Sequence, residues 1–588
     1  MNPRPLTRLA LVGALLTIIF QRAPKLDAQA PGPVHEQDVV IPMRDGVRLR
    51  ADLLRPAQGR APTLVYRTPY GKHDALAEYT TFTRAVERGY AVVVQDVRGR
   101  YASDGEFRPY ENEGRDGYDT IEWAAQQPWS NGRVGTFGLS YPGAVQWLAA
   151  VENPPHLQAM VPAMTFSTPQ NFFYSGGIWD LSWIPWIWDN IAPDARVRKH
   201  LPPVAREDRA TSNAHEKQMV ATLPLDRLSE LRDVAPYYYD WLRHPPDDPF
   251  WNFAELRNKY GRTNAAVLNL SGWNDDNYGP EGAITNFLGL VQARTGKPPR
   301  AALLLGPWVH GVDATARTKF GDRDFGPAAV IDYDEVVLGW LDRYLRDGAR
   351  AGPADAVRYF VMSDNQWRTS DNWPPRGRDS VYYLSSAGRA PKRGGLVAAP
   401  PAGAAAAPSS FRSNPDEPVT NPYGSSGVHD YHRFADRSDV LTFDSAPLER
   451  DTDATGPIRA RVYVSCDCRD TDLWVRLLDV APDGAAHNLM SPGVDGVRAS
   501  YRDLAKGRQL LSPGTIYEIR LDHLATSNLF RRGHRMRVQI SATFFPNFSR
   551  NLHTGDLETV SARMQPATIR VHHDGRHPSQ VSLHVVDR

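Results

Sequence analysis

One serine of this chain stands where a nucleophile could form. The segment Val134–Gly143 reads Val-Gly-Thr-Phe-Gly-Leu-Ser-Tyr-Pro-Gly, an apolar, β-prone stretch that runs into Ser140 and then into helix formers. A serine at a tight strand-to-helix turn presents its hydroxyl to a base, and the small residues Gly138 and Gly143 let that turn close. The usual elbow is G-x-S-x-G, whereas here the second glycine comes one residue late. An ordinary glycine-rich βα turn is therefore the alternative.

A carboxylate and a histidine follow Ser140 in an order that suits a proton relay. Asp275 and His310 each come shortly after a short apolar run, which is typical of a buried parallel strand. Open α/β sheets place their chemistry at the carboxyl ends of such strands. The order Ser, Asp, His is that of an α/β-hydrolase triad, in which His310 takes the Ser140 proton and Asp275 orients and stabilises the imidazolium. Spacing alone leaves Asp276 as an alternative to Asp275 for the orienting acid. For His310, the alternative is a structural residue without a catalytic role.

The segments that must position these residues alternate between strand and helix patterns. Residues 39–56 have the pattern of two paired strands joined by the turn at Arg44-Asp45-Gly46. Further strands are predicted at 63–66, 90–94, 266–270 and 301–305, and helices at 75–88 and 116–127. This alternation predicts the α/β class, with a parallel sheet covered on both faces. Residues 36–166 and 259–377 would form this α/β-hydrolase core.

An insertion at 167–258 separates the two parts of the predicted core. It is rich in aromatic residues and proline, and it contains a helical stretch at 214–231. Its place beside the catalytic strand ends predicts an inserted helical cap that walls a pocket for a hydrophobic acyl or aryl group. We expect most of its rings to build the core of the cap itself, with Tyr174 and Trp179 as the ones that face the substrate.

From 378 to 588 the apolar pattern changes to a period of two. Strand-like segments bounded by Gly, Pro and Asp lie at 380–384, 458–464, 473–480, 516–521, 536–542 and 567–573. They predict a C-terminal all-β sandwich, a jelly roll. Residues 397–408, rich in Ala, Pro and Gly, are expected to form a surface excursion.

The chain offers little for metal or disulfide chemistry. Its two cysteines, Cys466 and Cys468, would make a strained bridge at best and lack further zinc ligands, so we expect no disulfide framework. The histidines near 572–577 are expected to form a polar turn between two late strands. No metal ion or organic cofactor is expected.

Length and composition indicate a soluble protein of two or three domains. The chain has 588 residues, 41% hydrophobic and 23% charged, with a net charge of +1. Because no basic stripe is interleaved with aromatic residues, nucleic acid is not an expected partner.

The first 30 residues have the layout of a secretory signal peptide. Arg4 and Arg8 precede an apolar run over 9–20, and Ala28-Gln29-Ala30 is a small-x-small cleavage site. We therefore expect export to the periplasm or the cell exterior, with no stable membrane span after cleavage. An uncleaved anchor is the alternative.

Several motifs together resemble one known group of proteins. The chain is similar to the cocaine-esterase-like hydrolases, which share a fold with α-amino-acid ester hydrolases, glutaryl-cephalosporin acylases and X-Pro dipeptidyl-peptidases. The resemblance covers essentially the whole mature chain. The motifs that carry it are Arg67-Thr68-Pro69-Tyr70, Gln95-Asp96-Val97-Arg98-Gly99-Arg100-Tyr101, Asp119-Thr120-Ile121-Glu122-Trp123, Gly138-Leu139-Ser140-Tyr141, Gly306-Pro307-Trp308-Val309-His310 and Phe544-Phe545-Pro546-Asn547-Phe548-Ser549-Arg550-Asn551.

The resemblance implies a core, a cap and a C-terminal jelly roll, with Ser140, Asp275 and His310 as the triad. It also implies an oxyanion hole formed by the backbone N–H of Tyr141 and the hydroxyl of Tyr70. A tetrahedral oxyanion needs two such donors, and losing one typically costs on the order of 100- to 1000-fold in rate. Relatives of this kind are often oligomeric, so a homo-oligomer is a further expectation.

The chain departs from the amino-acid ester hydrolases just after the triad aspartate. Those enzymes hold the substrate ammonium with a cluster of carboxylates, and here the stretch is Asp276-Asn277-Tyr278, with one acid where two would be expected. Asp276 is the acid that could contact a substrate. A buried ammonium needs compensating charge, so neither strict α-amino specificity nor dipeptidyl-peptidase activity is expected.

The sequence thus predicts an exported serine hydrolase that acts on a small-molecule ester, or else an amide, through an acyl-enzyme. An X-Pro dipeptidyl-peptidase or a β-lactam or amino-acid acylase of the same fold is the nearer alternative. A carbohydrate- or surface-binding protein with a degenerate core is the more distant one.

Overall fold

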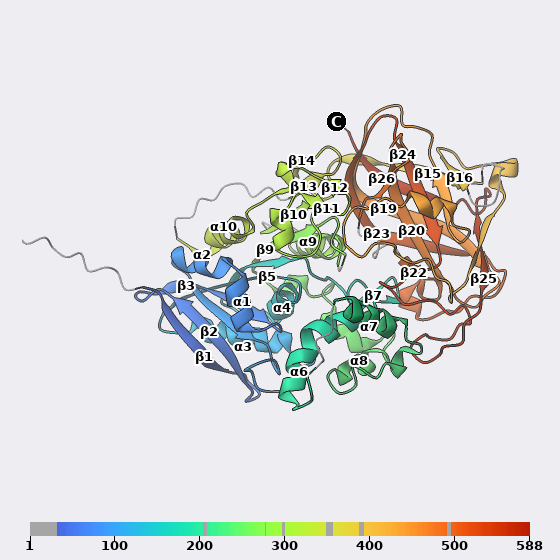
Figure 1. Cartoon of the computed structure of the whole chain (residues 1–588). Coiled ribbons are helices and arrows are strands. Elements are labelled where there is room, and N and C mark those ends of the chain that lie inside the picture. Colours follow the sequence, from blue (N-terminus) through green and yellow to red (C-terminus); the bar gives the residue numbers. More distant parts are fainter. Residues whose placement is uncertain are drawn as a thin grey trace, which may run out of the picture.

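The computed structural model describes residues 32–203, 209–276, 278–296, 300–347, 357–386, 393–490 and 496–587. Within them, a ten-stranded sheet forms one half of the molecule and a twelve-stranded sheet forms the other half (Figure 1). The predicted leader, residues 1–30, falls outside the described part. Among the described residues, no helix combines the length and the apolar character that crossing a membrane requires.

The ten-stranded sheet has a parallel centre and antiparallel edges, in the order β1-β2-β4-β3-β5-β6-β9-β10-β13-β14. Strands β4, β9 and β10 are buried along their whole length, which explains their continuous apolar runs. The register of β9 and β10 sets Gly272 beside Gly306, so the two strands end side by side. The bounds are Val34–Pro42 (β1), Arg48–Arg55 (β2), Ala61–Thr68 (β3), Ala91–Asp96 (β4), Ser130–Leu139 (β5), Leu157–Ala163 (β6), Ala266–Gly272 (β9), Ala301–Gly306 (β10), Val357–Val361 (β13) and Gln366–Ser370 (β14).

Helices cover both faces of this sheet, as the alternating pattern predicts. Helices α3, α4 and α9 pack on one face, and α2 and α10 pack on the other. The helix expected at 75–88 is divided into α1 and α2, because Tyr79 adopts an extended conformation. The bounds are Lys72–Glu78 (α1), Thr81–Glu87 (α2), Glu113–Ala125 (α3), Tyr141–Ala150 (α4), Glu281–Ala293 (α9) and Tyr333–Leu345 (α10).

The chain between β6 and β9 forms the cap, whose helices α6, α7 and α8 lie at the bottom of Figure 1, to the right of β1 and β2. Phe173 packs against Trp183, Trp241 and Trp251, so most of the rings build the core of the cap, as expected. The helix expected at 214–231 instead ends at Ala221, and a 3-10 turn follows at Leu225–Arg227. The bounds are Tyr174–Ser175 (β7), Ile178–Trp179 (β8), Trp183–Trp186 (α5), Ala192–Arg198 (α6), Arg209–Ala221 (α7) and Pro236–Trp241 (α8), with a π-helical turn at Ile187–Ile191.

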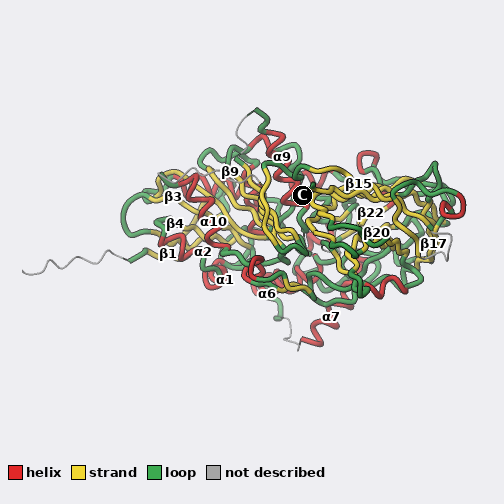
Figure 2. The backbone as a smooth tube through the Cα atoms, turned by 90° about the horizontal axis from the view of Figure 1, so that it is seen from above, coloured by secondary structure: helices red, strands yellow, loops and turns green. Residues whose placement is uncertain are grey.

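The C-terminal part of the chain is a separate β domain, which confirms the change of period after residue 378. Its sheet follows the order β17-β25-β19-β26-β15-β16-β18-β24-β20-β21, with β22 paired to β20 and β23 to β19. Figure 2 shows these strands on the opposite side of the molecule from β1, β3 and β4. The bounds are Gly377–Ser385 (β15), Arg393–Val397 (β16), Ser409–Ser413 (β17), Leu441–Asp444 (β18), Thr452–Cys466 (β19), Asp472–Val480 (β20), Ala486–Asn488 (β21), Gly496–Arg498 (β22), Tyr517–Phe530 (β23), Arg535–Ser541 (β24), Ala567–His572 (β25) and Gln580–Val586 (β26).

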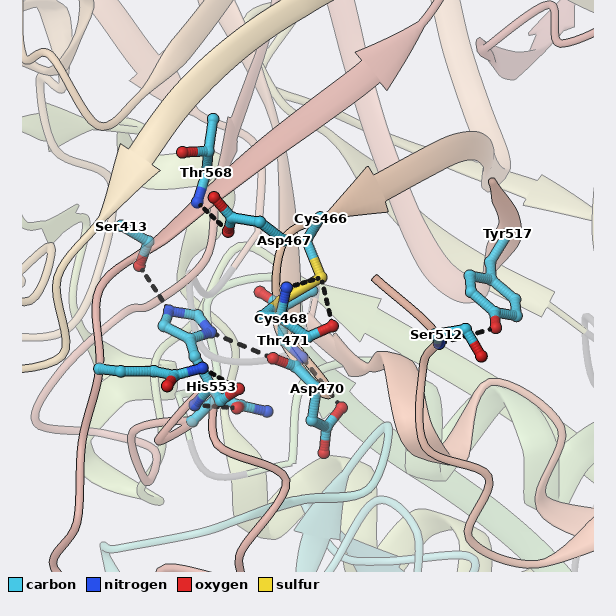
Figure 3. Close-up of a disulfide and its surroundings, with 12 residues drawn as sticks. Ser413, Cys466, Asp467, Cys468, Asp470, Thr471, Ser512, Tyr517, His553 and Thr568 are labelled. Atoms are coloured by element: carbon cyan, nitrogen blue, oxygen red, sulfur yellow. Dashed lines mark hydrogen bonds between the residues drawn. A yellow bond between two sulfur atoms is a disulfide. The ribbon is translucent and has the colours of Figure 1, made fainter. Parts of the chain in front are cut away.

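The expectation that the chain has no disulfide framework needs correction. Cys466 and Cys468 form a disulfide at the end of β19 (Figure 3). The turn there brings their Cα atoms to 5.2 Å, within the range that a disulfide spans. The predicted histidine turn does lie between β25 and β26, and its rings bond to strand hydroxyls: His572 Nε2 to Ser465 Oγ at 2.8 Å and His573 Nε2 to Ser409 Oγ at 2.9 Å.

The β domain is bonded to the cap through residues 544–558. The Leu181 N–H donates to the carbonyl of Asn547 at 2.9 Å, and the Leu225 N–H donates to that of Glu558 at 3.0 Å. Behind this contact, the buried Arg498 guanidinium bonds to the carboxylates of Asp472 and Glu558. The cap is therefore held to the β domain by hydrogen bonds.

Candidate active site

Ser140 lies in a sharp turn between β5 and α4. Its φ of 67° is in the left-handed region that side chains rarely adopt, so the surrounding structure must hold it there. A Cβ on Gly138 would lie 2.6 Å from Pro142, and one on Gly143 would lie 2.7 Å from the carbonyl of Ala163. Both glycines are therefore required for the turn, including the one that comes a residue late.

The ends of β9 and β10 bring the predicted acid and base together. His310 Nδ1 lies 3.1 Å from Asp275 Oδ1, and the Asp275 side chain is 0% exposed. The two loops are joined by backbone bonds, because the Trp273 N–H donates to Gly306 at 2.8 Å and the Asn274 N–H donates to Trp308 at 3.1 Å. The structure thus selects Asp275 over Asp276 as the partner of His310.

The environment of His310 favours its cationic form. Burial disfavours the imidazolium, but the charge of Asp275 and the hydrogen bond to it, with a contribution from Asp276, outweigh that effect. The pKa of His310 is therefore raised above its ordinary value. A histidine that is stabilised as a cation can accept the proton of a serine during attack.

The two residues of the predicted oxyanion hole, Tyr70 and Tyr141, both lie near Ser140. Tyr141 is the first residue of α4, so its N–H belongs to the helix N-terminus, where backbone donors lack intrahelical partners. The Tyr70 hydroxyl accepts a bond from Trp186 Nε1 at 3.1 Å and lies within hydrogen-bonding reach of the Ser140 side chain. Burial raises the pKa of Tyr70, which keeps this hydroxyl protonated as a donor. The Tyr141 ring is buried against Tyr110, so only the backbone N–H of this residue belongs to the predicted oxyanion hole.

Ser140 borders a cavity of about 70 Å³ whose walls are mostly aromatic. Its lining residues are Tyr110, Ser140, Phe172, Asp180, Ser182, Trp183, Trp186 and Tyr278. Tyr174 and Trp179, the rings predicted to face the substrate, lie elsewhere. The β7–β8 hairpin packs them against each other inside the cap, and the Tyr174 hydroxyl donates to the carbonyl of His244 at 2.6 Å.

Asp180 is a site residue that the sequence reasoning missed. Asp180 is 9% exposed and borders the Ser140 cavity, and its carboxylate accepts the Ser182 N–H at 2.8 Å. Burial raises the pKa of Asp180 to about 7, and the nearby charge of Asp276 adds to this, against the bonds from Ser182. One signal was available, because an acid in the otherwise apolar run 178–181 has no obvious structural purpose.

Asp276 faces the β domain and is absent from the lining of the Ser140 cavity. Its Oδ2 accepts the Ser426 hydroxyl, and it borders a second cavity of about 200 Å³ beside residues 421–431. Burial raises the pKa of Asp276. The predicted substrate contact of Asp276 is thus replaced by one to the β domain, while Asn277 falls outside the described residues.

The arrangement can perform nucleophilic acyl transfer. It supplies a nucleophile in a strained turn, a base paired with a buried carboxylate, and two donors for an oxyanion. Within the described residues, no group of three or more His, Cys, Asp or Glu side chains is placed to hold a metal ion.

Two protein families match the chain. Residues 45–312 match X-Pro dipeptidyl-peptidase (S15 family), and residues 351–582 match the X-Pro dipeptidyl-peptidase C-terminal non-catalytic domain. Cocaine esterase of Rhodococcus sp. (strain MB1 Bresler) is 34% identical over 595 residues, which cover 94% of this chain and 98% of that protein.

Solved structures confirm the fold. An aminopeptidase from the marine sediment archaeon Thaumarchaeota archaeon has a TM-score of 0.80 and an α-amino acid ester hydrolase one of 0.79. Each is 23% identical, and each alignment covers 97% of this chain and 99% of the other. The described architecture is accordingly an α/β-hydrolase core with a separate C-terminal β domain.

Proposed function

Since this chain belongs to the family of serine hydrolases that includes cocaine esterase and the X-Pro dipeptidyl-peptidases, we propose that it cleaves carboxylic esters at Ser140. It is a serine hydrolase, and its relatives support ester hydrolysis. The observation that carries the assignment to these residues is the bond between His310 and the buried Asp275, next to Tyr278, which lines the same cavity as Ser140.

The reaction follows from the geometry. Ser140 Oγ attacks the ester carbon, its proton moves to His310 Nε2, and the carbonyl electron pair shifts to oxygen, where Tyr70 and the Tyr141 N–H bind it. The carbonyl then re-forms, the bond to the alcohol oxygen breaks, and His310 returns the proton to that oxygen. Water repeats the sequence on the acyl-enzyme and releases the acid.

The cavity supports uncharged esters with a short acyl group. Its volume of about 70 Å³ is small beside the roughly 300 to 1000 Å³ of ordinary ligand pockets. Its aromatic walls, which include Phe172, Trp183 and Trp186, suit an apolar group.

A second candidate substrate class, α-amino esters, is favoured by one observation. The departure at residues 276–278 suggested too few acids to hold an ammonium, but the cap adds Asp180 to the same cavity. Above a pH of about 7 this carboxylate ionises and could pair with a substrate ammonium. Alanine and propionate p-nitrophenyl esters form a matched pair of substrates. Asp180→Asn should lower kcat/KM for the alanine ester alone if this class is correct, and equal effects on both would exclude it.

The ester hydrolase assignment is tested by labelling and by substrate comparison. A fluorophosphonate probe should label the wild-type protein and not Ser140→Ala. p-Nitrophenyl esters should be turned over faster than Xaa-Pro p-nitroanilides. Absence of labelling in folded protein would favour a binding role, and faster anilide cleavage would favour the peptidase.

We further propose that the protein is exported, which the signal-like leader supports. N-terminal sequencing of protein from the native host should then begin near residue 31. Protein that retains the leader in the cytoplasm would contradict export.

A further inference from the structure

A second tyrosine hydroxyl approaches the nucleophile. Tyr278 borders the Ser140 cavity and is 8% exposed, and the Ser140 side chain lies within hydrogen-bonding reach of its hydroxyl as well as of Tyr70's. The two tyrosines come from different loops, since Tyr70 follows β3 and Tyr278 follows β9. An oxyanion hole that already has Tyr70 and the Tyr141 N–H needs no third donor, so the Tyr278 hydroxyl calls for another role.

The position of Tyr278 places that hydroxyl on the histidine side of Ser140. Its N–H donates to Asp275 Oδ1 at 3.3 Å, the same oxygen that contacts His310. Its ring centroid lies 5.7 Å from that of His310 and 5.9 Å from that of Phe172. Tyr70, in contrast, is bonded to Trp186 of the cap. The two tyrosines therefore approach Ser140 from different surroundings, Tyr278 from beside Asp275 and His310 and Tyr70 from beside the cap.

We propose that Tyr278 is a further catalytic residue whose hydroxyl donates a hydrogen bond to the leaving-group oxygen. The inference rests on the proposed acyl-enzyme route through Ser140. When the carbon–oxygen bond to the alcohol breaks, negative charge develops on the alcohol oxygen before His310 has delivered its proton. A donor on the histidine side meets that charge, and Tyr278 keeps its own proton throughout.

The local electrostatics suit a donor that never ionises. Burial raises the pKa of Tyr278, and the charge of Asp275 raises it further. Its hydroxyl is therefore protonated throughout the range in which His310 titrates.

The test compares two acetate esters that share one acyl-enzyme. p-Nitrophenyl acetate has a leaving group that needs little help, whereas ethyl acetate must expel a basic alkoxide. Tyr278→Phe should lower kcat/KM for ethyl acetate about 10- to 100-fold, the worth of one hydrogen bond to a charged atom, and leave p-nitrophenyl acetate within about threefold. Tyr70→Phe should lower both alike, because both esters form the same oxyanion.

Two controls separate this role from a structural one. Tyr237→Phe removes a buried hydroxyl that has no hydrogen-bond partner among the described residues and lies outside the cavity, so both esters should react as in wild type. If Tyr278→Phe melts early, 3-fluorotyrosine at position 278 keeps the fold and changes only donor acidity, and only the ethyl acetate rate should respond.

Equal losses on both esters, or no loss on either, would overturn the role of Tyr278 while leaving the triad intact. Failure of the wild-type protein to label at Ser140 would instead refute the proposed function itself. The two failures are therefore distinguishable.

Discussion

Asp180 offers a pH-dependent test of the site's electrostatics. In the folded protein its pKa is about 7, whereas its ordinary value is 3.8, and the cause is burial in the cavity wall. The folded state therefore holds a proton that the unfolded chain has already released, so raising the pH from 4 to 7 destabilises the fold. Replacing the carboxylate by an amide in Asp180→Asn removes this dependence, while the new amide oxygen can still accept the Ser182 N–H.

The magnitude follows from the shift. A shift of about three pKa units corresponds to about 4 kcal/mol. Above pH 7 the buried carboxylate lowers the unfolding free energy of the wild type by this amount, and at pH 5 it lowers it by about 1 to 2 kcal/mol. Asp180→Asn should therefore raise the melting temperature more at pH 8 than at pH 5. Differential scanning calorimetry at the two pH values measures this double difference.

A matched variant controls for the loss of one negative charge. Asp313→Asn removes a carboxylate of the α/β core that is 76% exposed, so its effect should be nearly the same at both pH values. If Asp180→Asn also gives equal changes at pH 5 and pH 8, the buried carboxylate is not protonated in the folded state, and the reasoning about the cavity wall is refuted.

Three further predictions concern the triad, the β domain and the cavity. Asp275→Asn should lower kcat about 10⁴-fold with the fold intact. It should also move the acid limb of the pH–rate profile to lower pH, because Asp275 raises the pKa of His310. An unchanged acid limb would contradict the pairing of Asp275 with His310. Arg498→Met should destabilise the protein by about 3 to 5 kcal/mol in thermal or urea unfolding, since it leaves the buried Asp472 without its cation, and a change below about 1 kcal/mol would contradict this. Phe172→Ala should shift ester preference from acetate toward hexanoate in a chain-length series, and an unchanged preference would place the acyl group elsewhere.

The triad and most of the core could be predicted because their signals are local. A strand that is buried on both faces must be apolar along its length, so the runs before Asp275 and His310 identify both strand ends. The Ser140 turn needs glycines at 138 and 143 for steric reasons, and the sequence shows both. The choice between Asp275 and Asp276 needed coordinates, because adjacent residues differ only in the direction of their side chains.

The pocket residues could not be predicted, because they depend on how the cap folds onto the core. Tyr174 and Trp179 are aromatic residues beside the site in sequence, but the β7–β8 hairpin turns both into the cap interior. The next residue, Asp180, borders the cavity instead. Tyr278 was not singled out by the sequence, and only its contacts with Asp275 and Ser140 suggest a role in catalysis. A charged residue within an apolar run is the one sequence signal that could have drawn attention to Asp180.

The β domain takes part in forming the site although it supplies none of the triad. Ser426 binds the carboxylate of Asp276, which adjoins the triad aspartate, and without that hydroxyl a buried acid would lose a hydrogen bond next to His310. On the other side of the cavity, the carbonyl of Asn547 accepts the N–H of Leu181, the residue after Asp180. Both acids near the nucleophile are thus positioned by contacts that cross from the core or cap to the β domain. The electrostatics of the cavity therefore belong to the whole chain, and a core expressed without residues 378–588 would expose Asp276 and lose the contact that holds the Asp180 segment.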